Sequence, residues 1–455
     1  MPAILGANSD TGAYEISNSL VLYGGDSKLT QTPGSDGDRQ KWTWNGWVKR
    51  TGVEDDGMLF SVGTYTRIQF SSDTLYVQVS NNDSTAHAIQ TDREFRDPAS
   101  WYMITVAVDT TQGTAANRLK LYVNGVQETS FSTDQRSAIT QNASLATTGQ
   151  FEHRIGVRIN DIYYNDSYIA EVNLVDGQQL TPSSFGETND NGVWIPKKYT
   201  GAYGTNGFFL EFKQTGTSAN SSGIGADTSG NDHHFTVANI NAHSVNVDTP
   251  TLNYCTLNPV GGTDHQGSSG TLDNGALRIS VNQKSQGLTM DNVMLDGGRW
   301  YFEVYLAGGS LNSTIGFRNS DNGDDTPSVE IENDGQIKKD GSNVGSTDTA
   351  FSNGMVVGVI LDWSNTSSRK ITFETNNSAH SEGQQTFSDS NSNNGFHYHG
   401  RESGGTQLYN FGNTPAVFGN KTAGDNADAN GYGNFFYAVP SNHYAINSKN
   451  LAEFG

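Results

Sequence analysis

Two histidines one residue apart, His397 and His399, are the first side chains in this sequence that could do chemistry. On a β-strand, side chains at positions i and i+2 point to the same face, so the two imidazoles would lie close enough to share a metal ion. Two ligands specify a metal site only loosely, and Gly395 and Gly400 flank the pair. The pattern also fits two histidines of a surface loop, which is the interpretation we favour.

Two segments rich in oxygen ligands, residues 161–166 and 321–325, could bind calcium. Ca²⁺ prefers carboxylate and amide oxygens, and the segments read DIYYND and DNGDD. Neither segment matches a defined calcium-binding loop, and Asp and Asn are also the common residues of turns. We therefore expect no cofactor, and a calcium-dependent melting temperature would reveal the alternative.

The four residues Tyr163, Tyr164, Asn165 and Asp166 combine aromatic rings with polar side chains. Protein sites for sugars typically pair an aromatic platform with polar groups that fix the orientation of the ligand. This segment is therefore the predicted carbohydrate contact. A turn, or a contact between subunits, would explain the same residues.

Motifs of common enzymes are missing from the sequence. It contains no Gly-x-Ser-x-Gly elbow, no His-Glu-x-x-His zinc helix and no phosphate-binding Gly-Lys-Ser/Thr loop. Glycoside hydrolysis needs two carboxylates that flank the scissile bond, but no Glu-x-Asp-x-Glu strand occurs. Glu54, Asp55 and Asp56 are adjacent and precede Gly57, as in a turn. We expect a protein without enzymatic activity, with an unrecognised carboxylate pair as the alternative.

The elements that must position these residues are short amphipathic strands. In residues 298–306, Trp300, Phe302, Val304 and Leu306 share one face with period two. Similar ribbons occur at residues 42–48 and 101–108, and the run 355–361 is apolar on both faces, as in a central strand. Frequent short strands separated by Gly and Asn predict an all-β fold of antiparallel, jelly-roll type sandwiches.

Composition and charge exclude several functions. The chain has 455 residues, 52 glycines and 10% aromatic residues, with only 16% charged residues, which is unlike a disordered chain. Its formal net charge of -21 repels phosphate backbones, so we expect no nucleic-acid partner. No apolar stretch approaches the length of a membrane span, so we expect no membrane insertion.

The order of strand-rich and polar stretches predicts two modules joined by a linker. Residues 1–16 are expected to form an N-terminal arm, and residues 17–212 a first β-sandwich. Residues 213–258 are rich in Ser, Gly, Asn, Thr and Asp and show little periodicity, so we expect an extended linker there. Residues 259–455 are expected to form a second β-sandwich.

Each module contains a set of motifs that is typical of a known family. In the first module these motifs are residues 45–48, 101–109, 119–126, 169–172 and 176–178. With them the first module resembles the concanavalin A-like lectin/glucanase superfamily in its laminin-G-like form. In the second module the motifs are residues 298–304, 315–317, 333–337, 354–363 and 409–415. In this order they resemble a SPRY domain.

Further motifs are spread over both modules, at residues 4–8, 42–50, 192–194, 203–208, 253–259 and 450–455. With these motifs the whole arrangement is similar to structural proteins of marine bacteriophages. This resemblance implies a virion surface protein, such as a tail fibre or head fibre, that displays lectin-like domains for attachment to polysaccharide on the host cell surface. It also implies other virion proteins as partners and a homo-oligomer, with a trimer as the expectation. The alternatives are a purely structural capsid or tail decoration protein and a polysaccharide depolymerase.

Overall fold

The computed structural model confirms the all-β class and divides the chain into two compact units. Among the described residues, the N-terminal unit comprises residues 14–251 and the C-terminal unit comprises residues 252–455. The structure describes the chain except at residues 1–13, 24, 26, 53–55, 260–271, 281–282, 287–296, 310, 319–327, 366, 388–396 and 414–423.

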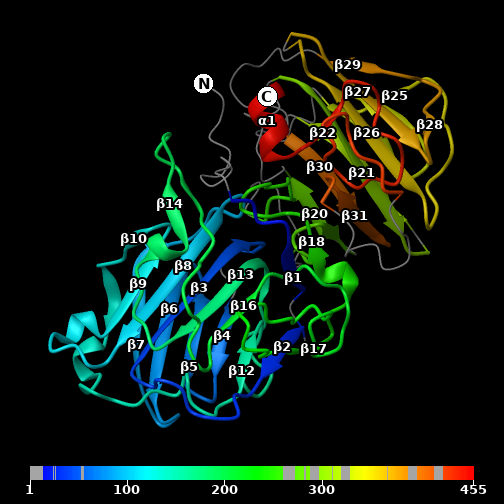
Figure 1. Cartoon of the computed structure of the whole chain (residues 1–455). Helices are drawn as coiled ribbons and strands as arrows, with labels where there is room; N and C mark the ends of the chain where they lie inside the picture. Colours follow the sequence, from blue (N-terminus) through cyan, green and yellow to red (C-terminus); the bar gives the residue numbers. More distant parts are fainter. Residues whose placement is uncertain are drawn as a thin grey trace. The chain divides into compact units, whose positions relative to one another are not determined.

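The N-terminal unit contains two eight-stranded antiparallel sheets, which are drawn mainly in blue, cyan and green in Figure 1. The first sheet has the order β10 (Val126–Gln127), β9 (Leu119–Val123), β8 (Trp101–Asp109), β3 (Lys41–Arg50), β13 (Asp166–Asp176), β1 (Ser19–Tyr23) and β18 (Val245–Asn246), and β16 (Phe208–Leu210) pairs with β13. The second has the order β11 (Phe131–Asp134), β7 (Thr85–Glu94), β6 (Thr74–Asn81), β5 (Thr66–Ser71), β4 (Gly57–Val62), β12 (His153–Ile155), β2 (Lys28–Gln31) and β17 (Thr236–Ala238).

The main core of this unit is built from alternate residues of both sheets. Trp42 and Trp44 of β3 are fully buried in it, together with Ile68 and Phe70 of β5. Trp47, whose phase is opposite to that of Trp42 and Trp44, is buried in a second cluster. Because side chains alternate along a strand, this second cluster lies on the other face of the first sheet.

The alternation of side chains is interrupted within β13. Strict alternation would place Ala170 on the same face as Val172 and Leu174, but Ala170 packs in the second cluster, whereas the other two lie in the main core. The register of β13 against β3 shifts between Ala170 and Asn173, and Glu171 has a φ of 47°. A bulge of this kind inserts an extra residue and reverses the side chains that precede it.

Residues 213–251 are not the predicted extended linker but part of the N-terminal unit. Within this segment, β17 pairs with β2 and β18 pairs with β1, and Phe235 and Ile240 are buried in the main core. Residues 252–258 belong to the C-terminal unit, where Cys255 and Leu257 are buried. A few buried apolar residues are enough to hold an edge strand on a sheet. The linker prediction missed them because the residues around them are mostly polar.

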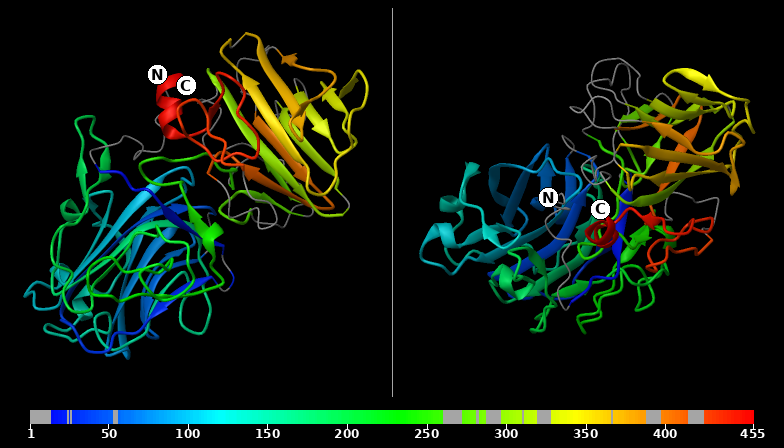
Figure 2. Two further views of the ribbon diagram at one scale, coloured as in Figure 1. Left: turned by 45° about the vertical axis from the view of Figure 1, so that its right-hand side comes forward. Right: turned by 90° about the horizontal axis from the view of Figure 1, so that it is seen from above.

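The C-terminal unit also contains two sheets, one of eight strands and one of six. Most of their strands are drawn in light green, yellow and orange in Figure 2. The first sheet has the order β19 (Arg278–Ile279), β31 (Thr406–Asn410), β21 (Arg299–Ala307), β26 (Val356–Asp362), β27 (Arg369–Thr375) and β28 (Ser378–Ala379), with β29 (Gln385–Phe387) on β27 and β32 (Tyr444–Ala445) on β21. The second has the order β20 (Gln283–Gln286), β30 (His397–Glu402), β22 (Ser313–Arg318), β23 (Ser328–Glu332), β24 (Ile337–Lys339) and β25 (Ser342–Val344).

The core of the C-terminal unit confirms the predicted face of residues 298–306. Trp300, Phe302, Val304 and Leu306 of β21 are all fully buried in it. The predicted central strand is also confirmed, because β26 pairs on one side with β21 and on the other with β27. The chain ends in a short helix, α1 (Ser448–Phe454). Among the described residues, no helix has the length and apolar character that a membrane span requires.

Candidate functional site

The predicted carbohydrate contact lies in the loop that connects β12 to β13. The loop is closed by a hydrogen bond from Arg158 N to Ile162 O (3.0 Å) and by one from Asn165 N to Gly156 O (2.9 Å). Tyr163 has a φ of 57°, in the left-handed region that non-glycine residues rarely adopt. Backbone strain of this kind occurs preferentially in binding loops and active sites.

The structure does not bring the four predicted residues together on one surface. Asn165 is buried, and its Nδ2 donates a hydrogen bond to Ser167 Oγ (2.7 Å). Asp166 begins β13, and its carbonyl oxygen accepts a hydrogen bond from Thr51 Oγ1 (2.6 Å). Tyr163 is 38% exposed and therefore remains available to a ligand, while Tyr164 is half-buried.

The outer face of the second sheet supplies polar and aromatic side chains from β5 and β6. Ile68 and Phe70 point into the core, so the alternate residue Arg67 points outward. Its partner in the ladder is Gln78, and the guanidinium carbon of Arg67 lies 4.7 Å from the ring centroid of Tyr76. Gln78 Nε2 donates a hydrogen bond to the Tyr76 hydroxyl (3.1 Å).

Arg158 connects the β12–β13 loop with this outer face. Its Nη2 donates a hydrogen bond to Thr64 O (2.9 Å), beside the exposed Tyr65 in the turn between β4 and β5. Its guanidinium carbon lies 5.9 Å from the ring centroid of Tyr163. Burial lowers the pKa of Arg158, and the nearby positive charge of Arg67 lowers it further.

These contacts define one surface, which we call the aromatic–arginine face. Three aromatic rings and three polar side chains from two strands, a turn and a loop form it. Of its members, only Tyr163 belonged to the predicted site. The alternation of side chains along β5 and β6 could have predicted the outward direction of the others on these strands. The members of the face are Tyr65, Arg67, Tyr76, Gln78, Arg158 and Tyr163.

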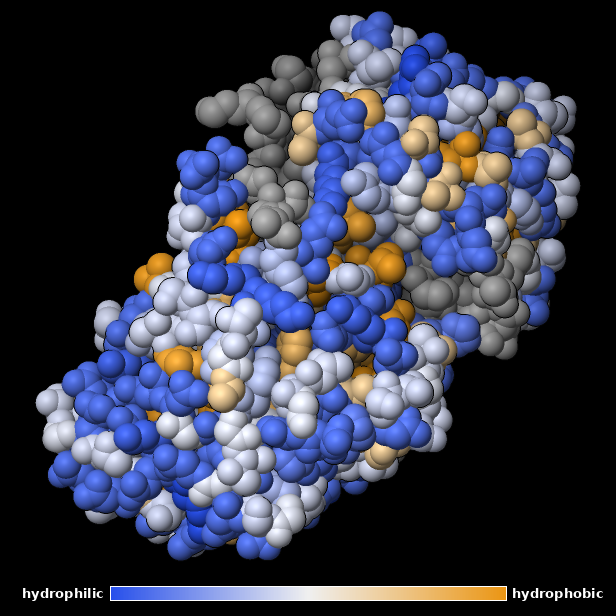
Figure 3. Space-filling view, viewed as in Figure 1, coloured by the Kyte–Doolittle hydropathy of each residue, from blue (hydrophilic) through white to orange (hydrophobic). Residues whose placement is uncertain are grey.

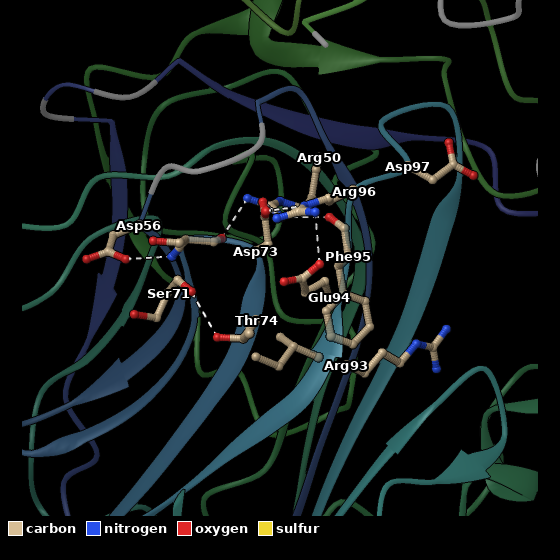
Figure 4. A network of polar contacts seen from close by, with 12 residues as sticks. Arg50, Asp56, Ser71, Asp73, Thr74, Arg93, Glu94, Phe95, Arg96 and Asp97 are labelled. Atoms are coloured by element: carbon tan, nitrogen blue, oxygen red, sulfur yellow. Dashed lines mark hydrogen bonds and ion pairs between the residues drawn. The ribbon is translucent and has the colours of Figure 1, made fainter. Parts of the chain in front are cut away.

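A separate polar network holds the strand ends at one edge of the N-terminal unit, as Figure 4 shows. Arg50 is buried, and it donates hydrogen bonds to the carbonyl oxygens of Phe95 (2.7 Å) and Ser72 (2.9 Å). The carboxylate of Asp73 accepts a hydrogen bond from Arg96 Nε (2.5 Å) and lies 3.6 Å from Arg50 Nη1. Because its charges and backbone groups are matched, this network fixes loops rather than offering a free site.

The predicted calcium segments have different outcomes. Residues 321–325 lie outside the described part of the chain. In the other segment, Asp161 Oδ1 lies 2.5 Å from Lys28 Nζ and 2.9 Å from Arg154 Nη1, and the hydrogen bond from Lys28 lowers the pKa of Asp161. These two cations already neutralise the first carboxylate that calcium would need.

The histidine pair is only partly described. The side chain of His397 lies outside the described part of the structure, whereas His399 is buried and its Nδ1 lies 2.8 Å from Glu330 Oε1. Arg318 also contacts this carboxylate. No group of three or more His, Cys, Asp or Glu residues suited to a metal is found in the described part of the chain. The metal site at His397 and His399 stays a prediction.

The bulged residue Glu171 is a buried carboxyl group on the other face of the first sheet. The Tyr14 hydroxyl donates a hydrogen bond to Glu171 Oε1. Burial raises the pKa of Glu171 from 4.5 to about 7, and the hydrogen bond from Tyr14 opposes this rise. The folded unit therefore binds a proton more tightly than the unfolded chain does.

We expect the stability of the N-terminal unit to fall as the pH rises from about 4.5 to about 7. Between these values the folded state holds more protons than the unfolded state, so raising the pH favours unfolding. The contribution is up to about 3 kcal/mol, at about 1.4 kcal/mol for each pKa unit. Calorimetric unfolding at pH 5 and pH 8 checks this. A Glu171→Gln variant should lose less stability over that interval, and an identical loss would contradict the assignment.

Residues 24–185 match the Concanavalin A-like lectin/glucanases superfamily. This match confirms the resemblance for the first module, and all six residues of the aromatic–arginine face lie within it. No curated protein matches the chain.

Several solved structures are similar to the chain at low identity. Mouse laminin α1 chain domains LG4-5 are 10% identical, with coverage of 88% of this chain and 90% of that chain and a TM-score of 0.30. A human SPRY domain is 15% identical, with coverage of 29% and 89% and a TM-score of 0.21. The CBM40 module of a Ruminococcus gnavus IT-sialidase, bound to α2,3-sialyllactose, is 12% identical, with coverage of 33% and 87% and a TM-score of 0.22. None of these likenesses bears on the ligand.

Proposed function

We propose that the N-terminal unit binds a saccharide on the aromatic–arginine face. The observation that carries this proposal is the exposure of large apolar side chains. Among the described residues only five are exposed, and Tyr65, Ile162 and Tyr163 belong to the turn and the loop that meet at Arg158. Figure 3 shows that hydrophilic residues predominate on the visible surface of this unit. Exposed rings beside planar polar groups suit the apolar faces and hydroxyl groups of a sugar.

The proposed role is binding without catalysis. Glycoside hydrolysis requires two carboxyl groups on either side of the scissile bond. The six residues of the aromatic–arginine face include no Asp and no Glu, so a saccharide bound there would contact no general acid from this set. Its amides and guanidinium groups can donate hydrogen bonds but cannot act as a carboxylic acid or nucleophile at pH 7.

The resemblance to marine bacteriophage structural proteins extends this proposal to a place on the virion. There the face would attach the particle to polysaccharide on the host cell, with other virion proteins and further copies of the chain as partners. Free protein added to host cells should reduce phage adsorption. If adsorption is unchanged and the cells bind no protein, the chain serves virion structure instead.

A glycan array with matched variants tests the site. We expect the full chain to bind at least one class of glycan, and Tyr163→Ala to weaken that binding about tenfold. An aromatic contact contributes about 0.5–1.5 kcal/mol beyond its buried area, and about 1.4 kcal/mol is a factor of ten in affinity. The matched control is Val126→Ala, because Val126 is exposed on β10 of the other sheet. Equal binding by both variants, or no binding by the unmodified chain, would refute the proposed site.

A further inference from the structure

Two arginines of the aromatic–arginine face lack the acidic partner that most other described arginines of this unit have. In the described part of the structure, no carboxylate forms an ion pair with Arg67 or Arg158. The neighbouring Arg154 contrasts with them, because it pairs with Glu152 (3.2 Å) and Asp161 (2.9 Å). In a chain of net charge -21, two adjacent unneutralised guanidinium groups are unexpected.

The two arginines are close enough to affect each other. The charge of Arg67 adds to the effect of burial in lowering the pKa of Arg158, and both guanidinium groups lie against tyrosine rings. Like charges held together destabilise each other unless an anion lies between or beside them. The aromatic contacts hold both groups in place without supplying that anion.

Unpartnered polar atoms on the same face point to a ligand. Arg67 Nε and Gln69 Oε1 are buried and have no hydrogen-bond partner within the described residues. The side chain of Gln69 is only 3% exposed, and by strand alternation it shares the outer face of β5 with Arg67. A buried polar atom without a partner costs about 1–3 kcal/mol, so such atoms usually mark a ligand contact or bound water.

We propose that the saccharide is acidic, and that Arg67 and Arg158 bind its carboxylate or sulfate group. This inference rests on the proposed glycan-binding function. Guanidinium groups donate paired hydrogen bonds to carboxylate and sulfate oxygens, and they do so better than lysine because their donors form a planar fork. The half-buried guanidinium groups of Arg67 and Arg158 donate to the acid group, and Tyr163 packs against the sugar ring.

A saccharide fits this surface better than a nucleic acid. The protein as a whole is strongly acidic, and its negative field repels a polyanion of closely spaced phosphates. The two arginines are a local exception to this charge. An isolated acid group on a sugar requires only this local pair. The amide and tyrosine groups beside it then discriminate the hydroxyl pattern of the ring.

Binding of the full chain to an array of uronate-containing, sialylated, sulfated and neutral glycans tests the inference. We expect acidic glycans to bind and their neutral counterparts to bind at least about tenfold more weakly, because a charge-assisted hydrogen bond contributes about 1.5–3 kcal/mol. Arg67→Gln and Arg158→Gln should each weaken binding by a similar factor. Arg67→Lys keeps the charge but loses the paired donors, so its loss should be smaller. Comparison of the uronate and sulfated arms identifies which acid group is bound.

Arg401→Gln is the matched control, because it removes the same charge from an exposed arginine in the C-terminal unit. Circular dichroism confirms that each variant is folded. If neutral glycans bind as well as acidic ones, and Tyr163→Ala weakens them while both arginine variants do not, the acidic ligand is wrong and the glycan-binding face stands. If no glycan binds at all, both proposals fail.

Discussion

Replacing Asp248 with Asn will destabilise the N-terminal unit by about 3–5 kcal/mol, the usual cost of removing one charge of a buried ion pair. Asp248 Oδ2 lies 2.8 Å from Lys49 Nζ, and both side chains are completely buried. Asp248 Oδ1 also accepts a hydrogen bond from Trp101 Nε1 (3.2 Å). The substitution keeps the shape of the side chain but removes the negative charge that lies beside the buried ammonium group of Lys49.

Calorimetry of the full chain measures this effect. For a unit of this size, about 1 kcal/mol shifts the melting temperature by roughly 2–4 °C, so a loss of roughly 6–20 °C is expected. Glu187→Gln is the control, because its pair with Lys197 is exposed and contributes little. The double variant Lys49→Met/Asp248→Leu should recover much of the loss, since it removes both charges. A shift no larger than that of the control would contradict the assigned role of Asp248.

Glu303→Ala should destabilise the C-terminal unit by roughly 3 kcal/mol or more. The buried carboxylate of Glu303 accepts hydrogen bonds from Phe436 N (2.8 Å), Tyr437 N (2.9 Å), Tyr301 Oη (3.0 Å) and Asn410 Nδ2 (3.0 Å). The alanine variant leaves these donors without that acceptor, and each buried unsatisfied donor costs about 1–3 kcal/mol.

Two comparisons make the Glu303 experiment specific. Glu303→Gln retains one oxygen acceptor and places an amide donor where a second acceptor was, so its loss should lie between those of the original chain and the alanine variant. Glu303→Ala should shift the calorimetric transition of the C-terminal unit, whereas Asp248→Asn should shift that of the N-terminal unit. An alanine variant that melts at the original temperature would show that these donors find other partners.

The predictions for the strands succeeded where the alternation of side chains decides which residues are buried. Trp300 and Phe302 are buried as alternation requires, and the opposite phase of Trp47 correctly separated it from Trp42 and Trp44. The same rule does not account for Glu303, which alternation places on the face of β21 opposite to Trp300 and Phe302 but which is also fully buried. Three of its four hydrogen-bond donors come from residues more than a hundred positions away, which no local pattern reveals.

The candidate site could be predicted only in part for the same reason. Tyr163 was found because an aromatic residue in a polar loop is visible in a short window of sequence. Its partners Arg67 and Arg158 are 91 positions apart, and only the pairing of β4, β5 and β12 brings them to one face. The predicted linker failed because Asp248 and Phe235 are isolated in a polar stretch, although each is buried in the folded unit.

The proposed site is tested by a crystal structure of the full chain with a bound saccharide selected from the array. We expect the saccharide to lie on the outer face of the second sheet, with its ring against Tyr163 and its acid group within hydrogen-bond distance of Arg67 and Arg158. A saccharide bound instead at the Arg50 network or on the C-terminal unit, with the aromatic–arginine face empty, would contradict it.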